Sequence, residues 1–141
     1  PFAWYRNEDG MLVESGADVG FAQSGSFRGV VATDHNGDGV LDPMVTSIAD
    51  VTRFYLSDGC TENSWFEVSA PSGSRVELTV GDDLRVAWTS NESGWSSSGP
   101  SVAHFGLGLA SEVSGLKVST PDGEIYSAEG ALRARRRVWV E

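Results

Sequence analysis

One acidic loop carries the clearest chemical signal in this sequence of 141 residues. Oxygen-bearing side chains stand at positions one, three, five and nine of residues 34–42, and a glycine stands at position six. Hard Ca²⁺ ions take about six to eight oxygen ligands, and glycine permits the sharp turn that aims alternate side chains inward. The three carboxylates of the loop would also repel one another without a cation between them. The predicted ligands of one Ca²⁺ ion are Asp34, Asn36, Asp38, the carbonyl group of Val40, and Asp42.

The residues around this loop do not predict the helices of an EF-hand. An EF-hand loop ends on a bidentate glutamate at its last position, where this sequence has Val45. A dockerin loop also requires an acidic residue there. Apolar, strand-like residues precede the loop at 27–33 and follow it at 44–47. We therefore expect the loop to connect two β-strands.

The pattern and its flanking strands resemble the FG-GAP/VCBS repeat, in which a calcium loop joins two strands of a β-propeller blade. Residues 28–34, which lead into the loop, and residues 43–46, which leave it, carry the resemblance. Residues 5–13, with an Asp-Gly turn, are similar to the end of a preceding repeat. The resemblance implies a propeller-blade-like calcium hairpin unit, which we place at residues 1–60. It also implies that the chain is a fragment of a larger propeller protein or forms oligomers, since one blade rarely stands alone.

Two histidines offer the remaining catalytic chemistry. His35 holds a non-ligand position inside the acidic loop and is expected to face solvent. His104, together with a serine of residues 96–98, is the basis of an alternative hydrolase hypothesis. The sequence has no Gly-x-Ser-x-Gly nucleophile elbow, so we favour a hydrogen-bonded structural role for His104 at the start of a strand.

Trp95 lies in a polar loop rich in serine and glycine. An exposed indole there could stack on a sugar ring, which gives a second alternative function, a carbohydrate-binding module. Anchoring of the loop by the indole is the favoured interpretation. The only cysteine, Cys60, cannot form a disulfide within the chain, so cysteine usage does not decide the redox compartment.

The elements that must position these residues are short β-strands. Residues 75–88 contain two segments with alternating apolar residues around a Gly-Asp turn, and residues 116–126 contain two more around Pro-Asp-Gly. Residues 132–140 alternate as one strand, and Arg136 on its apolar face indicates a sheet edge. Residues 47–56 fit a helix or a strand–turn–strand, and their β-branched residues favour strands. The predicted fold class is all-β, with roughly ten to twelve short antiparallel strands.

The C-terminal part contains five short motifs, at Gly73–Val76, Gly94–Ser97, His104–Gly108, Leu116–Val118 and Pro121–Gly123. Their order resembles that of the ASPIC/UnbV domain, which follows VCBS repeats in secreted proteins of the cartilage acidic protein group. The resemblance implies a β-sandwich or barrel-like domain without established catalysis, placed at residues 61–141.

Composition narrows the range of partners. Twenty acidic and ten basic residues give a net charge of −10, which excludes phosphate-driven nucleic-acid binding as the default. The sequence has no apolar run of the roughly 18 residues that a membrane helix needs, and no visible signal peptide. We therefore expect a secreted or cell-surface, calcium-binding β module with a structural or adhesive role and no catalysis. Its expected partners are calcium and a protein or carbohydrate ligand.

Overall fold

The structure is a computed structural model that describes residues 3–21, 23–59, 61–92 and 97–141. Within these residues it contains β-strands and no helix, as the alternating sequence pattern predicted. No described segment therefore forms an apolar helix long enough to cross a membrane. The strands are β1 (Tyr5–Glu8), β2 (Met11–Glu14), β3 (Phe27–Thr33), β4 (Asp42–Ser47), β5 (Arg53–Phe54), β6 (Ser64–Ser69), β7 (Arg75–Val80), β8 (Asp83–Trp88), β9 (Val102–Gly108), β10 (Glu112–Ser119), β11 (Ile125–Arg133) and β12 (Arg136–Trp139).

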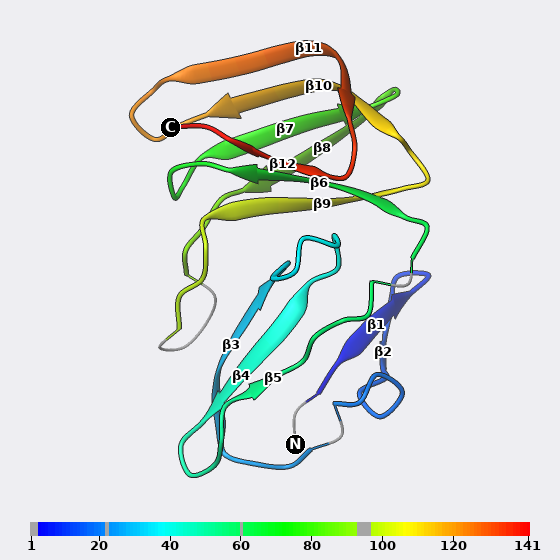
Figure 1. The fold of residues 1–141 in the computed structure, drawn as a ribbon, viewed down its shortest axis with the longest axis vertical. Coiled ribbons are helices and arrows are strands. Elements are labelled where there is room, and N and C mark those ends of the chain that lie inside the picture. The colour runs from blue at the N-terminus through cyan, green and yellow to red at the C-terminus, as the bar shows by residue number, and fades with distance from the viewer. Residues whose placement is uncertain (1–2, 22, 60, 93–96) are drawn as a thin grey trace.

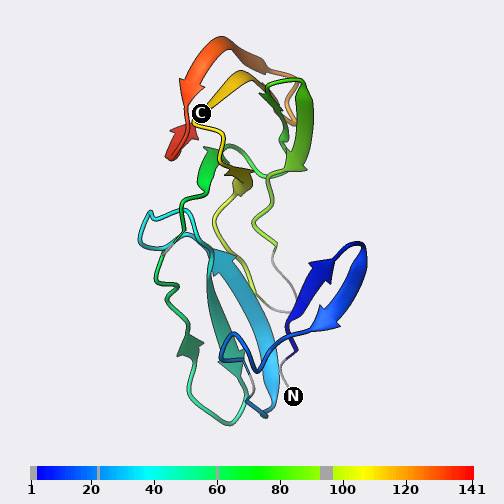
Figure 2. The ribbon, with the colours of Figure 1, turned by 90° about the vertical axis from the view of Figure 1, so that its right-hand side faces the viewer.

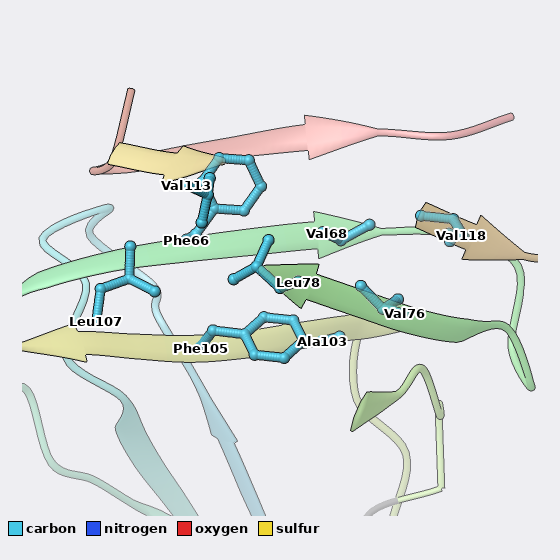
Figure 3. Packing of buried hydrophobic residues seen from close by; sticks show 10 residues of the cluster. Phe66, Val68, Val76, Leu78, Ala103, Phe105, Leu107, Val113 and Val118 are labelled. Atoms are coloured by element: carbon cyan, nitrogen blue, oxygen red, sulfur yellow. The ribbon is translucent and has the colours of Figure 1, made fainter. Parts of the chain in front are cut away.

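Two sheets of the C-terminal part pack face to face as a sandwich. The outer sheet has the strand order β11-β10-β7-β8, and the inner sheet has the order β12-β6-β9. Figure 1 shows the outer sheet above the inner sheet, with β3–β5 below both. Apolar side chains from both sheets meet between them, as Figure 3 shows for Phe66, Leu78 and Phe105. The buried cluster consists of Phe66, Val68, Ala70, Val76, Leu78, Ala103, Phe105, Leu107, Val113 and Val118.

Both predicted hairpins of the sandwich are confirmed. β7 pairs with β8 across the Gly-Asp turn, and β10 pairs with β11 across the Pro-Asp-Gly turn. The described strand pairs are antiparallel except that of β12 with β6, which is parallel. The predicted antiparallel arrangement is therefore correct except at this one edge.

The prediction of one continuous strand over residues 132–140 is wrong. β11 ends at Arg133, and the chain crosses to the inner sheet before β12 begins at Arg136. Arg135 lies between them with a φ of 57°, in the left-handed region rather than the extended region of a regular strand. Arg136 pairs in register with the core residue Phe66, so it lies on the apolar face as predicted, but it is exposed at the sheet edge. The predicted edge position is confirmed, because β12 is the edge of the inner sheet.

The N-terminal part forms a two-stranded ribbon and a three-stranded sheet. β1 and β2 pair around Asp9 and Gly10, both with positive φ, and project to one side in Figure 2. β3, β4 and β5 form the second sheet, in that order. The strand–turn–strand favoured for residues 47–56 is confirmed, since β4 ends at Ser47 and β5 returns antiparallel to it.

Candidate metal centre

The acidic loop, residues 34–42, joins β3 to β4 as the flanking sequence predicted. Thr33 pairs with Asp42 at the end of the β3–β4 ladder, so the first and last carboxylates of the loop stand at its base. Both are buried, with exposed fractions of 5% for Asp34 and 0% for Asp42. The structure thus brings all five predicted ligand residues into one connection, with its two ends fixed by paired strands.

The Asp34 carboxylate organises the first half of the loop. Its Oδ1 accepts hydrogen bonds from the backbone N–H of Gly37 (2.8 Å) and of Asp38 (3.1 Å). Its Oδ2 accepts one from the N–H of Gly39 at 2.9 Å. Three successive amides therefore wrap around this carboxylate, which explains why the loop can bury it.

The Asp42 carboxylate closes the second half and reaches the following segment. Its Oδ2 accepts a hydrogen bond from the N–H of His35 at 2.9 Å, and its Oδ1 accepts one from the N–H of Ser57 at 2.7 Å. Asp42 thus connects both ends of the acidic loop to residues after β5. The sequence gives no local signal for the contact with Ser57.

Asp38 and Asn36 contact each other at the tip of the loop. Asn36 Nδ2 donates to Asp38 Oδ2 at 2.7 Å, and the N–H of Val40 donates to Asp38 Oδ1 at 2.8 Å. A side chain at Gly59 would displace the Asp38 carboxylate, because its Cβ would lie 2.5 Å from Asp38 Oδ2.

The donor set fits a hard cation, although the acidic side chains are not gathered around one point. Among the described residues, no three His, Cys, Asp or Glu side chains form a group that could hold a metal. The predicted set, however, also relies on an amide and a carbonyl oxygen. Within the described part of the chain, the salt bridges do not involve Asp34, Asp38 or Asp42. Buried charges in proteins are paired or coordinate metals. Asp34 and Asp42 have backbone N–H donors and no cationic side chain among the described salt bridges.

The inner sheet contacts this loop through residues that the sequence analysis did not assign to the site. The indole of Trp65 in β6 lies against Gly39, and Arg137 in β12 reaches the Asp34 carbonyl group. A cleft of about 310 Å³ lies between the loop and the sheet, with Trp65, Glu67, Arg137 and Trp139 along the sheet side. These contacts join segments far apart in the chain, so no local motif could reveal them.

The structure describes only some of the other residues that the sequence singled out. His104 lies inside β9 rather than at its start, and its Nε2 donates a hydrogen bond to the Gly39 carbonyl at 3.0 Å. His35 is exposed, as predicted, with its ring edge-on to Phe54 at 5.2 Å between centroids. Trp95, Ser96 and Cys60 lie outside the described residues, so the hypotheses built on them stay predictions.

Comparison with known protein families identifies the family of the C-terminal sandwich. The family described as "ASPIC and UnbV" matches residues 69–140, about half of the chain. The chain belongs to the ASPIC and UnbV family. The match covers β7 to β12, so the ASPIC/UnbV resemblance is confirmed for the C-terminal part. Because this match begins after the acidic loop, the FG-GAP/VCBS resemblance of residues 1–60 stays a prediction, as does the domain boundary.

Two relatives extend the similarity beyond the ASPIC and UnbV segment. Cartilage acidic protein 1 from Mus musculus and from Homo sapiens are each 30% identical to the chain over 132 residues, covering 84% of it. A match of that extent includes part of residues 1–68. The chain spans only 20% of the length of each relative.

Proposed function

We propose that this protein is a calcium-binding, non-catalytic β module that acts as a structural or adhesive part of an extracellular or cell-surface protein. The observation that carries the proposal is the burial of Asp34 and Asp42 in a loop of oxygen donors, without a salt bridge among the described residues. A cation at this point would offset the cost of burying the two carboxylates. Calcium suits the site because it accepts flexible geometry and oxygen ligands.

Binding at the loop would strengthen the connection between β3 and β4. Asp34 directly follows β3 and Asp42 begins β4, so an ion held by both would join the strand ends. Asn36 would have to turn its amide away from Asp38 to offer its oxygen. Such a rearrangement is small, because it needs only side-chain rotation at an exposed position.

The non-catalytic and extracellular parts of the proposal have separate support. His104, the candidate base of a hydrolase, directs Nε2 to a backbone carbonyl group and so has a structural role available to it. Both relatives carry the name cartilage acidic protein 1, and this chain shares their acidic character with a net charge of −10. We extend an extracellular location to this chain on that similarity.

Thermal unfolding in chelator, in millimolar Ca²⁺ and in millimolar Mg²⁺ tests the proposal. A ligand that binds only the folded state stabilises it by about 2.7 kcal/mol when its concentration is about a hundredfold above Kd. We therefore expect Ca²⁺ to raise the Tm by several degrees. Mg²⁺ should do less, because it demands stricter octahedral geometry and releases its water reluctantly.

The matched variants are Asp38→Ala and Asp82→Ala. Both remove one carboxylate, but Asp82 lies in the exposed turn between β7 and β8, away from the acidic loop. Asp38→Ala should abolish the calcium-induced shift in Tm, and Asp82→Ala should retain it. Equal melting curves of the wild type in chelator and in Ca²⁺ would refute the calcium proposal.

A further inference from the structure

A row of three polar side chains crosses the inner sheet on the face that meets the acidic loop. Arg137 of β12 pairs in register with Glu67 of β6, and Glu67 pairs in register with His104 of β9. Residues directly opposite on neighbouring strands share a face of the sheet. The adjacent residues Phe66 and Phe105 lie in the core of the sandwich, so the row points away from that core.

The centre of the row is buried, and its two ends, Arg137 and His104, are half-buried. Glu67 has an exposed fraction of 1%, which is unusual for a carboxylate on the face of a sheet. Nε and Nη2 of Arg137 each lie 2.6 Å from Oε2 of Glu67, so the buried charge is paired. This pairing also fixes the orientation of the guanidinium group.

From this row, two side chains reach the backbone of the acidic loop. His104 Nε2 donates to the Gly39 carbonyl at 3.0 Å, and Arg137 Nη2 lies 3.5 Å from the Asp34 carbonyl oxygen. Trp65, two residues before Glu67 and on the same face, packs on Gly39 so closely that an added Cβ would lie 1.7 Å from its Cδ1. Asp34 and Gly39 bound the turn whose amides surround the Asp34 carboxylate.

We propose that Arg137, Glu67 and His104 are positioning residues that hold the acidic loop in its ligating shape, so that the inner sheet sets the calcium affinity of the loop. Holding Asp34 and Gly39 fixes both ends of the turn before an ion arrives, which lowers the conformational cost of binding. Partners that orient metal ligands commonly change metal affinity by about 10- to 100-fold when they are removed. This inference rests on the proposed calcium function.

Arg137→Met separates positioning from simple charge. Loss of a positive charge near the loop removes a Coulomb repulsion, which by itself would make Ca²⁺ bind more tightly. Loss of positioning makes it bind more weakly, and we expect the Kd for Ca²⁺ to rise about 10-fold. The Kd is measured by titration against a chromophoric chelator, at a temperature where circular dichroism shows the variant to be folded. Arg137→Lys should fall between the two proteins, because lysine keeps the charge but not the planar fork.

Arg136→Met is the matched control, because Arg136 is the exposed neighbour on the same strand and carries the same charge. It should leave the Kd unchanged or slightly lower. His104→Phe removes the second contact without altering the Glu67–Arg137 pair, and it should raise the Kd independently. Unchanged or tighter Ca²⁺ binding by both Arg137→Met and His104→Phe would overturn the inference.

Hydrogen exchange keeps this inference distinct from the calcium proposal. The amides of Gly37, Asp38 and Gly39 are protected by the Asp34 carboxylate. In chelator, they should exchange faster in Arg137→Met and His104→Phe than in Arg136→Met. If the wild type binds no Ca²⁺, the proposed function fails, and these exchange rates alone decide whether the sheet positions the loop. Equal rates in the three variants would overturn that positioning.

Discussion

The C-terminal sandwich and the N-terminal part of the molecule are stabilised in different ways. The sandwich buries a contiguous apolar cluster between its sheets. Among the described residues before β6, the buried apolar side chains are Phe21, Val31, Pro43 and Val45, and the carboxylates of Asp34 and Asp42 are buried beside them in the sequence. Hydrophobic burial therefore explains the sandwich, whereas the N-terminal part depends on hydrogen bonds and on its contact with the inner sheet.

The β1–β2 ribbon shows the same contrast in its extreme form. All residues of both strands are exposed, including Met11 and Leu12. An isolated two-stranded ribbon is marginally stable in water. We therefore expect local stability to decrease from the sandwich, through β3–β5, to this ribbon.

The largest expected effect is a core truncation in the sandwich. Phe66 is fully buried between the sheets, and Phe66→Ala should lower the free energy of unfolding by about 3–5 kcal/mol because it leaves a cavity. The matched variant is Phe54→Ala in β5, whose side chain is 48% exposed and should cost about 1 kcal/mol or less. Urea unfolding followed by tryptophan fluorescence measures both. Similar losses at the two positions would contradict the contrast between the two parts.

The strands of the sandwich were predictable from alternation, but the face of one strand was not. Val76 and Leu78 are buried, as their pattern in β7 suggests, whereas Leu84 and Trp88 of β8 are exposed. The turn between the strands has two residues, so Val80 pairs with Asp83. Leu84 and Trp88 then pair with Thr79 and Arg75, which do not face the core of the sandwich. Apolar alternation alone does not include this constraint. Trp88 is instead covered in part by Arg75, whose guanidinium carbon lies 5.9 Å from the ring centroid.

The acidic loop was predictable because its signal is local. The spacing of oxygen donors around a glycine predicted the loop, and the apolar residues on either side predicted its two flanking strands. The burial of Asp34 and Asp42 was not predicted. The partners of the loop were not predictable in this way, because Arg137 lies 103 residues from Asp34 in the chain. Arg137 also belongs to a cluster of arginines whose sequence pattern predicts one solvent-exposed surface. In the structure, Arg133, Arg135 and Arg136 are exposed, whereas Arg137 is half-buried and pairs with Glu67.

A smaller effect should follow from a methyl group added to the acidic loop. Gly39 combines a φ of +89° with close packing against Trp65, so Gly39→Ala should cost about 2–4 kcal/mol from backbone strain and overlap together. Gly37 has a φ of +78° with nothing within 4 Å, so Gly37→Ala should cost only the strain, about 1–2 kcal/mol. The difference between the two free energies of unfolding measures the contact with the inner sheet. Equal losses at Gly37 and Gly39 would show that Trp65 does not pack tightly on the acidic loop.

The smallest effect should come from an arginine that does not face the acidic loop. Arg136 is exposed on the edge strand β12, and charges at such positions contribute within about 0.5 kcal/mol. Arg136→Ser should therefore leave the free energy of unfolding nearly unchanged at low and at high salt. Arg137→Ser, one residue later, removes the partner of a buried carboxylate and should cost clearly more. Both variants replace arginine by serine at neighbouring positions of β12. Their difference in the free energy of unfolding therefore measures the contribution of the face that the acidic loop covers. If Arg136→Ser were as destabilising as Arg137→Ser, the loss of stability would not depend on which face of β12 the arginine occupies. The contact with the N-terminal part would then not explain it.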